Sequence, residues 1–275
     1  MIYKEISIRV KDAETEGKLT TYLLSKSKEL DRNVHPLILI CPGGGYEYTS
    51  DREAEAIALQ WNSFGYHAAV LRYSVYPALF PTSLLEVATC MKLFRENAKE
   101  WGIDENRILV QGFSAGGHLA ASFGCFWKED FVAKALELTD SECIKPNGLI
   151  LAYPVITAGP FTHQGSIDHL LGDGEVREKY LEKMSLENQV TKDVPPTFLW
   201  TTSEDGCVPA ENAFFFFQAL RKNDVPAEIH CFAKGGHGLS LADERTDNPF
   251  HGAKEKLCTG WMDLANKWLE EVILK

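Results

Sequence analysis

The residue best suited to chemistry is a serine in a glycine-rich turn. Ser114 is the central residue of Gly112–Gly116, which fits the pattern G-x-S-x-G. The segment 107–111 before it predicts a strand, and the segment 117–121 after it predicts the start of a helix. A sharp strand-to-helix turn holds a serine hydroxyl clear of the backbone, as a nucleophile requires. Ser114 is therefore the predicted nucleophile, and the alternative is a glycine-rich turn without chemistry.

A serine hydroxyl needs a neighbouring base, and the chain offers a histidine in a glycine-rich loop. His237 lies in Lys234–Gly238, just past a strand predicted at 227–232. The flanking glycines allow its imidazole to reach a site at the carboxyl end of that strand. His230 and His251 are rival candidates, but His230 lies inside the strand and His251 begins the last predicted helix. His237 is the predicted base.

The base in turn needs an acid that orients its ring. The loop Ser203–Pro209 follows a strand predicted at 197–202 and contains Glu204 and Asp205. Asp205 precedes a glycine, which indicates a turn, and its shorter side chain is the commoner orienting acid. Glu204 remains the alternative. The chain order is then serine, acid and histidine, which is the order expected when such a nucleophile follows a strand of a mostly parallel sheet. Each of the three lies at the carboxyl end of a predicted strand.

A run of glycines follows an earlier strand. Gly43, Gly44 and Gly45 come soon after the apolar segment 36–41, which predicts a strand buried on both faces. Acyl transfer places negative charge on a carbonyl oxygen, which preorganised N–H groups stabilise. The predicted donors are Gly44 or Gly45, which have no Cβ to block the approach, and Ala115. A phosphate-binding loop is the disfavoured alternative, because the chain has no G-x-x-x-x-G-K-[ST] and this run is not G-x-G-x-x-G.

Short apolar segments alternate with longer helical patterns, which predicts a mostly parallel sheet with helices on both faces. The predicted strands are 2–10, 19–24, 36–41, 68–73, 107–111, 148–153, 197–202 and 227–232. The predicted helices are 51–64 (with Ser50 as N-cap), 83–101, one from about 115, 210–223 and 254–274. The first two strands are amphipathic, and we expect them to pair as a hairpin.

One stretch, about 155–195, breaks this alternation. Connections are normally short, so an insertion of roughly 40 residues is either functional or a cap over a site. We find no internal repeat, low-complexity tract or Pro/Ser linker. The sequence therefore predicts one α/β domain over residues 1–275, with a short cap insertion.

Composition restricts the partners. The 275 residues include 28 Lys and Arg against 39 Asp and Glu, a net charge of −11, which disfavours nucleic acids and anionic membranes. The seven cysteines are far apart and form no metal-binding motif, a pattern typical of free thiols in a reducing compartment. No signal peptide or membrane-spanning run is recognised. We expect a cytoplasmic protein with a small-molecule partner and without metal or organic cofactor.

These segments resemble the α/β-hydrolase fold, and more narrowly the bacterial acetyl-esterase and acetylxylan-esterase-like carboxylesterases. The resemblance covers most of the chain, through Cys41–Tyr46, Asn97–Asp104, Arg107–Leu119, Pro195–Trp200, Asp205–Pro209 and Gly235–Gly238. It implies a catalytic triad of Ser114, Asp205 and His237, with oxyanion donors in the glycine loop and at Ala115. Many relatives begin the glycine loop with His, whereas this chain has Pro42, so the family pattern does not specify which loop N–H groups donate.

The resemblance implies hydrolysis of short acyl esters, such as acetyl groups on sugars. Tyr46, Tyr48, Phe161 and His163 are the candidates for contacts with the alcohol part of such a substrate. Two other functions stay open. A peptidase or formamidase would use the same triad on an amide, and a non-catalytic relative would bind a ligand with the same fold.

Overall fold

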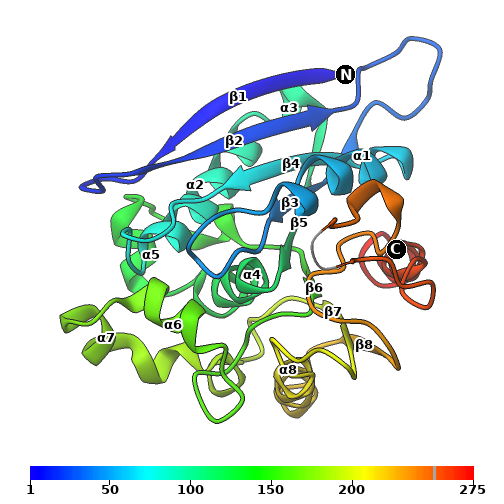
Figure 1. Ribbon diagram of the computed structural model, residues 1–275. Helices are drawn as coiled ribbons and strands as arrows, with labels where there is room; N and C mark the ends of the chain where they lie inside the picture. The colour runs from blue at the N-terminus through cyan, green and yellow to red at the C-terminus, as the bar shows by residue number, and fades with distance from the viewer. Residues whose placement is uncertain (250–251) are drawn as a thin grey trace.

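The computed structural model describes residues 1–249 and 252–275, and an eight-stranded sheet runs through it in the order β1-β2-β4-β3-β5-β6-β7-β8 (Figure 1). The strands are β1 (Ile2–Arg9), β2 (Glu16–Leu23), β3 (His35–Cys41), β4 (His67–Arg72), β5 (Ile103–Phe113), β6 (Gly148–Ala152), β7 (Thr197–Thr202) and β8 (Ala227–Phe232). The β1–β2 and β2–β4 pairs are antiparallel, and the pairs from β4 through β8 are parallel. The predicted hairpin and mostly parallel sheet are confirmed.

The clearest difference among the strands is the length of β5, which begins before the predicted segment 107–111. Its register against β3 shifts between the pairs His35–Ile103 and Leu37–Ile108. Polar residues at 104–106 occupy this irregular part, so the apolar pattern marks only the second half of the strand. That half leads into the turn that contains Ser114.

The helices lie between these strands. They are α1 (Glu55–Ser63), α2 (Thr82–Glu96), α3 (Ala98–Trp101), α4 (Ala115–Phe126), α5 (Asp130–Ala135), α6 (Gln164–Leu171), α7 (Glu175–Tyr180), α8 (Glu211–Lys222) and α9 (Trp261–Trp268). A 3-10 turn, Asp51–Glu53, precedes α1, and the side chain of Ser50 makes no capping hydrogen bond. The predicted helix 83–101 is divided at Asn97 into α2 and α3.

The last helix is shorter than predicted. Residues 254–260 form loop and turns, and α9 begins at Trp261 and continues as a π-helix over Leu269–Ile273. The amide of Glu255 donates to the carbonyl of Ala242, a contact outside the helical pattern. The amides of Cys258 and Trp261 donate to the carbonyls three residues back, those of Glu255 and Cys258, so turns stand in place of the predicted start of the helix.

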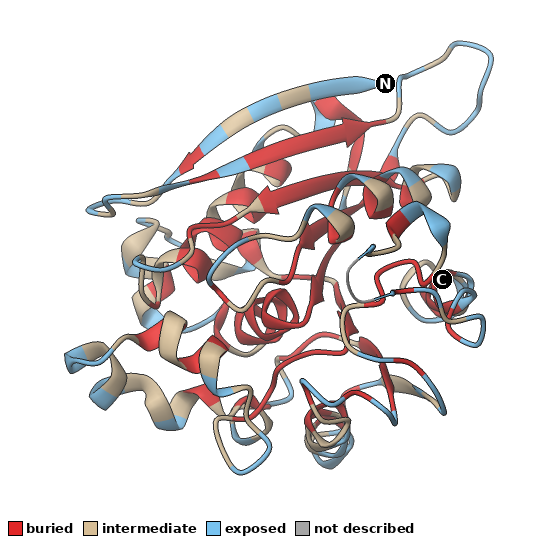
Figure 2. Cartoon of the chain, in the orientation of Figure 1, coloured by how far each residue is buried: buried red, intermediate tan, exposed pale blue. Residues whose placement is uncertain are grey.

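Helices cover both faces of the sheet. Buried side chains of α2, α4 and α8 pack on one face, and those of α1 and α9 pack on the other. The central strands β3, β6 and β7 are buried at every residue (Figure 2). The rings of Trp200 in β7 and Trp261 in α9 stack with their centroids 5.1 Å apart. The sheet thus forms a rigid support for the loops at its ends.

The connection between β6 and β7, residues 153–196, contains α6, α7 and two 3-10 turns. It packs against the main body: Leu170 and Leu171 are buried, and the carbonyl of Leu170 accepts from the amide of Phe80. The helices α6 and α7 lie together at the lower left of Figure 1. Residues of this connection reach the pocket described below.

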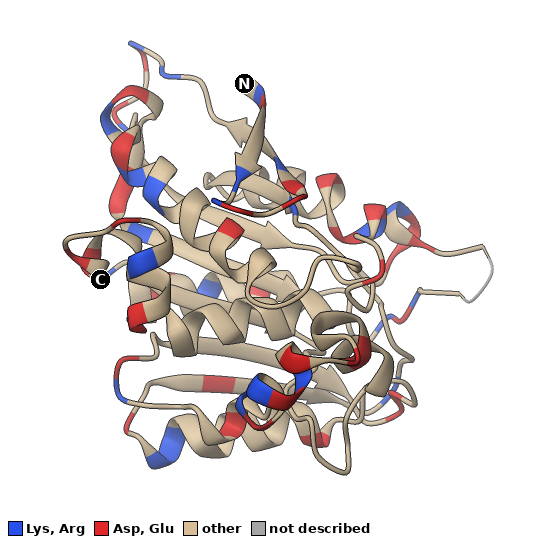
Figure 3. Ribbon diagram, turned by 90° about the vertical axis from the view of Figure 1, so that its left-hand side faces the viewer, with Lys and Arg blue, Asp and Glu red and all other residues tan. Residues whose placement is uncertain are grey.

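Charged residues of both signs are interspersed over the helices and loops (Figure 3). The central strands β3, β6 and β7 contain none. In the part of the chain that the structure describes, we find no helix that is long and apolar enough to cross a bilayer.

Candidate active site

Ser114 lies in a tight turn between β5 and α4. Its φ is +51°, and its amide donates to the carbonyl of Ala152 at 3.0 Å. A Cβ on Gly112 would lie 2.0 Å from the carbonyl oxygen of Gly116, and one on Gly116 would lie 2.1 Å from that of Cys41. Only glycine fits these two positions, so the G-x-S-x-G pattern reflects close backbone packing around the serine.

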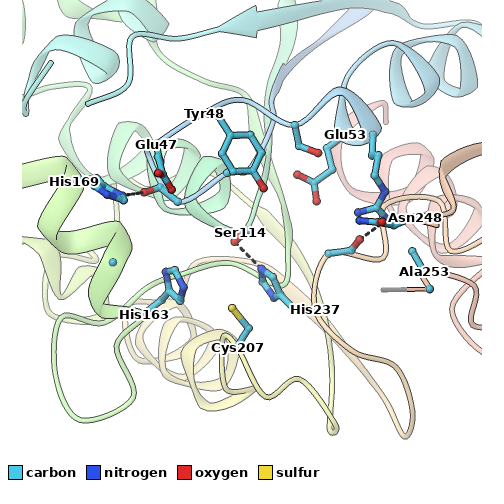
Figure 4. Close-up of a pocket in the computed structure, with 17 residues that line it drawn as sticks. Glu47, Tyr48, Glu53, Ser114, His163, His169, Cys207, His237, Asn248 and Ala253 are labelled. Carbon is cyan, nitrogen blue, oxygen red and sulfur yellow. Dashed lines mark hydrogen bonds between the residues drawn. The ribbon is translucent and has the colours of Figure 1, made fainter. Parts of the chain in front are cut away.

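The side chains of Ser114, His237 and Asp205 form a continuous hydrogen-bonded chain. Nε2 of His237 lies 2.7 Å from Oγ of Ser114, and Nδ1 lies 2.7 Å from Oδ2 of Asp205 (the serine contact is drawn in Figure 4). A carboxylate only accepts, so Nδ1 carries the proton and Nε2 accepts from the serine hydroxyl. This geometry allows the imidazole to take the proton of Ser114.

Asp205 is held by its own loop. Its side chain is 1% exposed, and Oδ1 accepts from the amides of Cys207 at 3.0 Å and Val208 at 2.9 Å. These bonds occupy one carboxylate oxygen and direct the other toward His237. The structure therefore brings together the serine, acid and histidine that the sequence singled out.

The rival residues lie elsewhere. Glu204 accepts from the amide of Gly235 at 3.2 Å, and no described contact joins it to His237. His230 is paired with Glu228 at 2.7 Å on β8. His251, the other rival base, falls outside the described residues.

The glycine loop after β3 has one position that only glycine accommodates. Gly44 has a φ of +130°, and a Cβ there would lie 2.1 Å from the carbonyl oxygen of Tyr48. Gly45 has a φ of +65°. Among the described residues, the N–H groups of Gly44, Gly45 and Ala115 have no protein acceptor. Free N–H groups beside a nucleophile are what an oxyanion requires.

A cavity of about 630 Å³ opens over Ser114 and His237. Gly44, Gly45, Tyr48 and His163 contribute to its wall, together with polar side chains from several loops: Glu47, Arg52, Glu53, His169, Cys207 and Asn248 (Figure 4). Tyr48 and His163, two of the four residues predicted to contact the substrate, therefore line this cavity. Among the described residues we find no group of three His, Cys, Asp or Glu side chains that could hold a metal ion.

Tyr46 and Phe161, the other two candidates for substrate contacts, do not line this cavity. Tyr46 is buried, and its hydroxyl lies 3.0 Å from Nδ1 of His118 in helix α4. Phe161 packs edge-on against Phe215, with 5.7 Å between ring centroids. An aromatic residue beside a functional loop packs as readily into the core as into a pocket, and the sequence does not separate these cases.

His163 presents a defined tautomer to the cavity. Its Nδ1 accepts from the amide of Ser166 at 3.3 Å and so caps helix α6, which leaves the ring proton on Nε2. Burial lowers the pKa of His163 below its usual value, and the nearby His237 acts in the same direction. The ring is therefore neutral at pH 7 and has one N–H to donate.

Several residues of the site had no recognisable sequence signal. Arg52 and Glu53 begin a helical segment, where charged residues are ordinarily solvent-exposed. His169 lies inside the β6–β7 connection, and its Nδ1 donates to the carbonyl of Gly45 at 2.9 Å. Cys207 follows the predicted acid, and its spacing from other cysteines gives no hint of a pocket position.

The family model BD-FAE matches residues 24–220, which is most of the chain and includes the glycine loop, Ser114 and Asp205. The chain belongs to the BD-FAE family. This membership, with the structural neighbours below, confirms the α/β-hydrolase fold and the resemblance to acetyl esterases.

Curated relatives of this BD-FAE chain include a xylanase and an acetylxylan esterase. It is 35% identical over 221 residues to endo-1,4-beta-xylanase B of Butyrivibrio fibrisolvens, covering 79% of this chain and 34% of that protein. It is 27% identical over 205 residues to an acetylxylan esterase of Xylanibacter ruminicola, covering 73% of this chain and 40% of that protein. The chain thus spans well under half the length of these two relatives.

Solved structures match the chain over nearly its whole length. An acetyl ester-xyloside bifunctional hydrolase from Caldicellulosiruptor lactoaceticus is 35% identical with a TM-score of 0.80, covering 98% of this chain and 96% of that one. A carboxylesterase from Lactobacillus plantarum WCFS1 is 28% identical with a TM-score of 0.85, covering 98% of both chains. Both neighbours are named as ester hydrolases, and the BD-FAE chain shares their fold.

Proposed function

We propose that this protein is a serine esterase that cleaves short-chain carboxylic esters through an acyl-enzyme. The observation that carries the proposal is the chain of 2.7 Å contacts from Ser114 through His237 to Asp205 at the base of an open cavity. Each member of this chain supplies what the next requires, which is a base for the hydroxyl and an orienting acid for the base.

In this mechanism Ser114 attacks the ester carbonyl while His237 takes its proton. Asp205 holds the imidazole in the required tautomer and stabilises the imidazolium ion. The oxyanion accepts hydrogen bonds from Ala115 and from Gly44 or Gly45. His237 then protonates the departing alcohol, and a water molecule cleaves the acyl-enzyme by the same route.

We propose that the natural substrates are acetylated sugars, from which the enzyme removes the acetyl groups. The supporting observations are the acetylxylan esterase and the acetyl ester-xyloside hydrolase among the similar proteins, and the polar wall of the cavity. Tyr48 and Asn248 line it together with Glu47 and His163, and these groups donate to or accept from sugar hydroxyls. The β6–β7 connection contributes His163 and His169 to this wall, so we assign it the role of a fixed cap.

The first experiment compares hydrolysis of p-nitrophenyl acetate, butyrate and octanoate by the wild type and by Ser114→Ala. We expect fast turnover of the two shorter esters and a loss of at least about 10³-fold in Ser114→Ala. The matched control is Ser122→Ala, which changes another buried serine in helix α4 outside the cavity and should keep its activity.

Wild-type turnover in Ser114→Ala would contradict the assignment of the nucleophile. A folded enzyme that ignores the esters but reacts with a fluorophosphonate probe at Ser114 would indicate an amide substrate instead. Absence of both turnover and labelling would indicate the ligand-binding relative, because labelling requires an activated serine.

A further inference from the structure

The cavity wall contains a buried carboxylate that the proposed mechanism does not use. Glu53 ends the 3-10 turn Asp51–Glu53, and its side chain points toward the cavity near Ser114 (Figure 4). The residue is only 3% exposed. Burial of a carboxylate is costly unless both oxygens are hydrogen-bonded, so its partners should reveal its role.

One oxygen of Glu53 holds the glycine loop. Oε2 accepts from the amide of Gly43 at 2.8 Å. A Cβ built on Gly43 would lie 2.8 Å from this oxygen and 3.0 Å from Cβ of Ser114. Gly43 is therefore packed between the carboxylate and the nucleophile, directly before the predicted oxyanion donors Gly44 and Gly45.

The other oxygen of Glu53 is linked to the histidine loop, which we define as residues 233–243 around His237. Oε1 accepts from the hydroxyl of Tyr153 at 2.6 Å, and this hydroxyl accepts from the amide of Ser240 at 2.9 Å. Ser240 follows His237 in the same loop. The ring of Tyr153 also meets the ring of His237 edge-on, with 5.1 Å between centroids.

The residue before Glu53 reaches the same loop. The guanidinium of Arg52 donates to the carbonyls of Gly238 and Thr246, each at 2.7 Å. The hydroxyl of Ser240 donates back to the carbonyl of Arg52 at 2.5 Å. The 3-10 turn therefore contacts both loops that flank Ser114.

We propose that Glu53 is a positioning residue, which sets the glycine loop and the histidine loop at the correct separation around Ser114. This inference rests on the proposed esterase function. Its action is indirect: the carboxylate orients the Gly43 peptide and the Tyr153 hydroxyl, and these orient the groups that meet the transition state.

Glutamine has nearly the same shape but one acceptor oxygen in place of two. In Glu53→Gln the new NH₂ group can face the amide of Gly43, and two donors then oppose each other. If it faces the hydroxyl of Tyr153 instead, the hydroxyl proton has no acceptor. One loop is released in either case. We expect kcat for p-nitrophenyl acetate to fall about 10-fold or more with KM within about 2-fold, because the loss falls on the transition state.

A second readout separates positioning from general stability. Phenylboronic acid forms a tetrahedral adduct with an active serine, and its hydroxyl occupies the position of the oxyanion. We expect its inhibition constant to rise in Glu53→Gln by a factor similar to the fall in kcat. Tyr153→Phe keeps the Gly43 bond and cuts only the link to Ser240, so it should lower kcat by a smaller factor.

The control is Glu86→Gln. Glu86 is also fully buried and accepts from the amide and hydroxyl of Ser74, at 2.7 and 2.5 Å, but it does not line the cavity. This variant should lower the melting temperature and leave kcat and boronate inhibition unchanged.

Unchanged kcat in Glu53→Gln, or a fall in kcat with unchanged boronate inhibition, would overturn the proposal. If Glu53→Gln does not fold, wild-type kcat in a folded Tyr153→Phe would overturn the link between the loops. Wild-type enzyme and Ser114→Ala are measured alongside. Absence of Ser114-dependent turnover in the wild type would count against the esterase function itself and not against Glu53.

Discussion

Nδ1 of His169 donates a hydrogen bond of 2.9 Å to the carbonyl oxygen of Gly45, and so joins helix α6 to the glycine loop. The two residues are 124 positions apart in the chain. Gly45 has a left-handed backbone conformation, and a Cβ built on it would lie 3.9 Å from Oγ of Ser166 and 4.0 Å from the ring of His163. The β6–β7 connection thus does more than enclose the cavity, because it also restrains a loop that supplies a predicted oxyanion donor.

We expect His169→Ala to lower kcat for p-nitrophenyl acetate by about 3- to 10-fold, because the freed loop no longer holds its N–H groups toward the oxyanion. Steady-state kinetics measures the effect. Asp168→Ala is the control, since it breaks the 2.8 Å ion pair with Arg177 in the same connection without touching the glycine loop. Equal losses in both variants would show that the effect is general to the connection.

The assignment of the acid predicts different results at neighbouring positions. Asp205→Asn should reduce kcat by roughly 10²- to 10⁴-fold, because an amide does not hold the imidazole in the required tautomer. Glu204→Gln should stay close to wild type, since Glu204 contacts only the amide of Gly235 among the described residues. Ester hydrolysis by the two purified variants tests this, and the opposite ranking would make Glu204 the acid.

The glycine loop should not accept a side chain at Gly44. In Gly44→Ala the new Cβ would lie 2.1 Å from the carbonyl of Tyr48 at a φ of +130°, so the loop must move. We expect a loss of about 10²-fold or more in kcat together with a lower melting temperature. Gly260→Ala is the control, because a Cβ there meets nothing within 4 Å. Retained activity in Gly44→Ala would remove this residue from the oxyanion site.

Acid should destabilise the fold through two buried histidines. Burial lowers the pKa of both His67 and His118 from the ordinary 6.5 to about 4. The unfolded chain therefore binds protons in this interval that the folded chain does not, and stability falls as pH decreases from about 6.5 to 4. Each histidine contributes up to about 1.4 kcal/mol per pH unit.

Urea denaturation between pH 7.5 and 4.5 measures this effect. His67→Gln and His118→Gln should each show a weaker pH dependence than the wild type. Burial also raises the pKa of Glu86, and this shift stabilises the fold as pH falls, opposite to the effect of the histidines. The wild-type slope therefore combines both effects, and only the comparison with the variants isolates the histidines. An unchanged slope in both variants would show that these histidines titrate normally.

The sheet was predictable because its central strands are buried on both faces. The run at 197–202 coincides with β7, which is buried at every residue. The run at 227–232 coincides with the edge strand β8, which is only partly buried and follows the same apolar pattern less strictly. The prediction failed where tertiary contacts override a local pattern, as in the first half of β5 and in residues 254–260. Helical periodicity near the C-terminus describes an amphipathic segment, but it does not reveal that the amide of Glu255 bonds to the carbonyl of Ala242 or that turns precede α9.

For the site, the sequence located the residues whose chemistry is unusual for a turn: Ser114 between glycines, Asp205 before a glycine and His237 in a glycine-rich loop. The residues that hold these loops were not predictable. Glu53 and His169 bind backbone groups 10 and 124 positions away, and a hydrogen bond to a backbone amide or carbonyl imposes no pattern on the partner's sequence.

The β6–β7 connection carries none of the three residues of the proposed triad, which follow β5, β7 and β8. Substitutions within it can therefore alter the alcohol pocket while the reacting groups stay in place. This separation makes the connection the natural target for directed evolution toward new leaving groups. His169 should be kept in such a library, because its bond to Gly45 holds the glycine loop. Its replacement would change the reaction rate together with the selectivity.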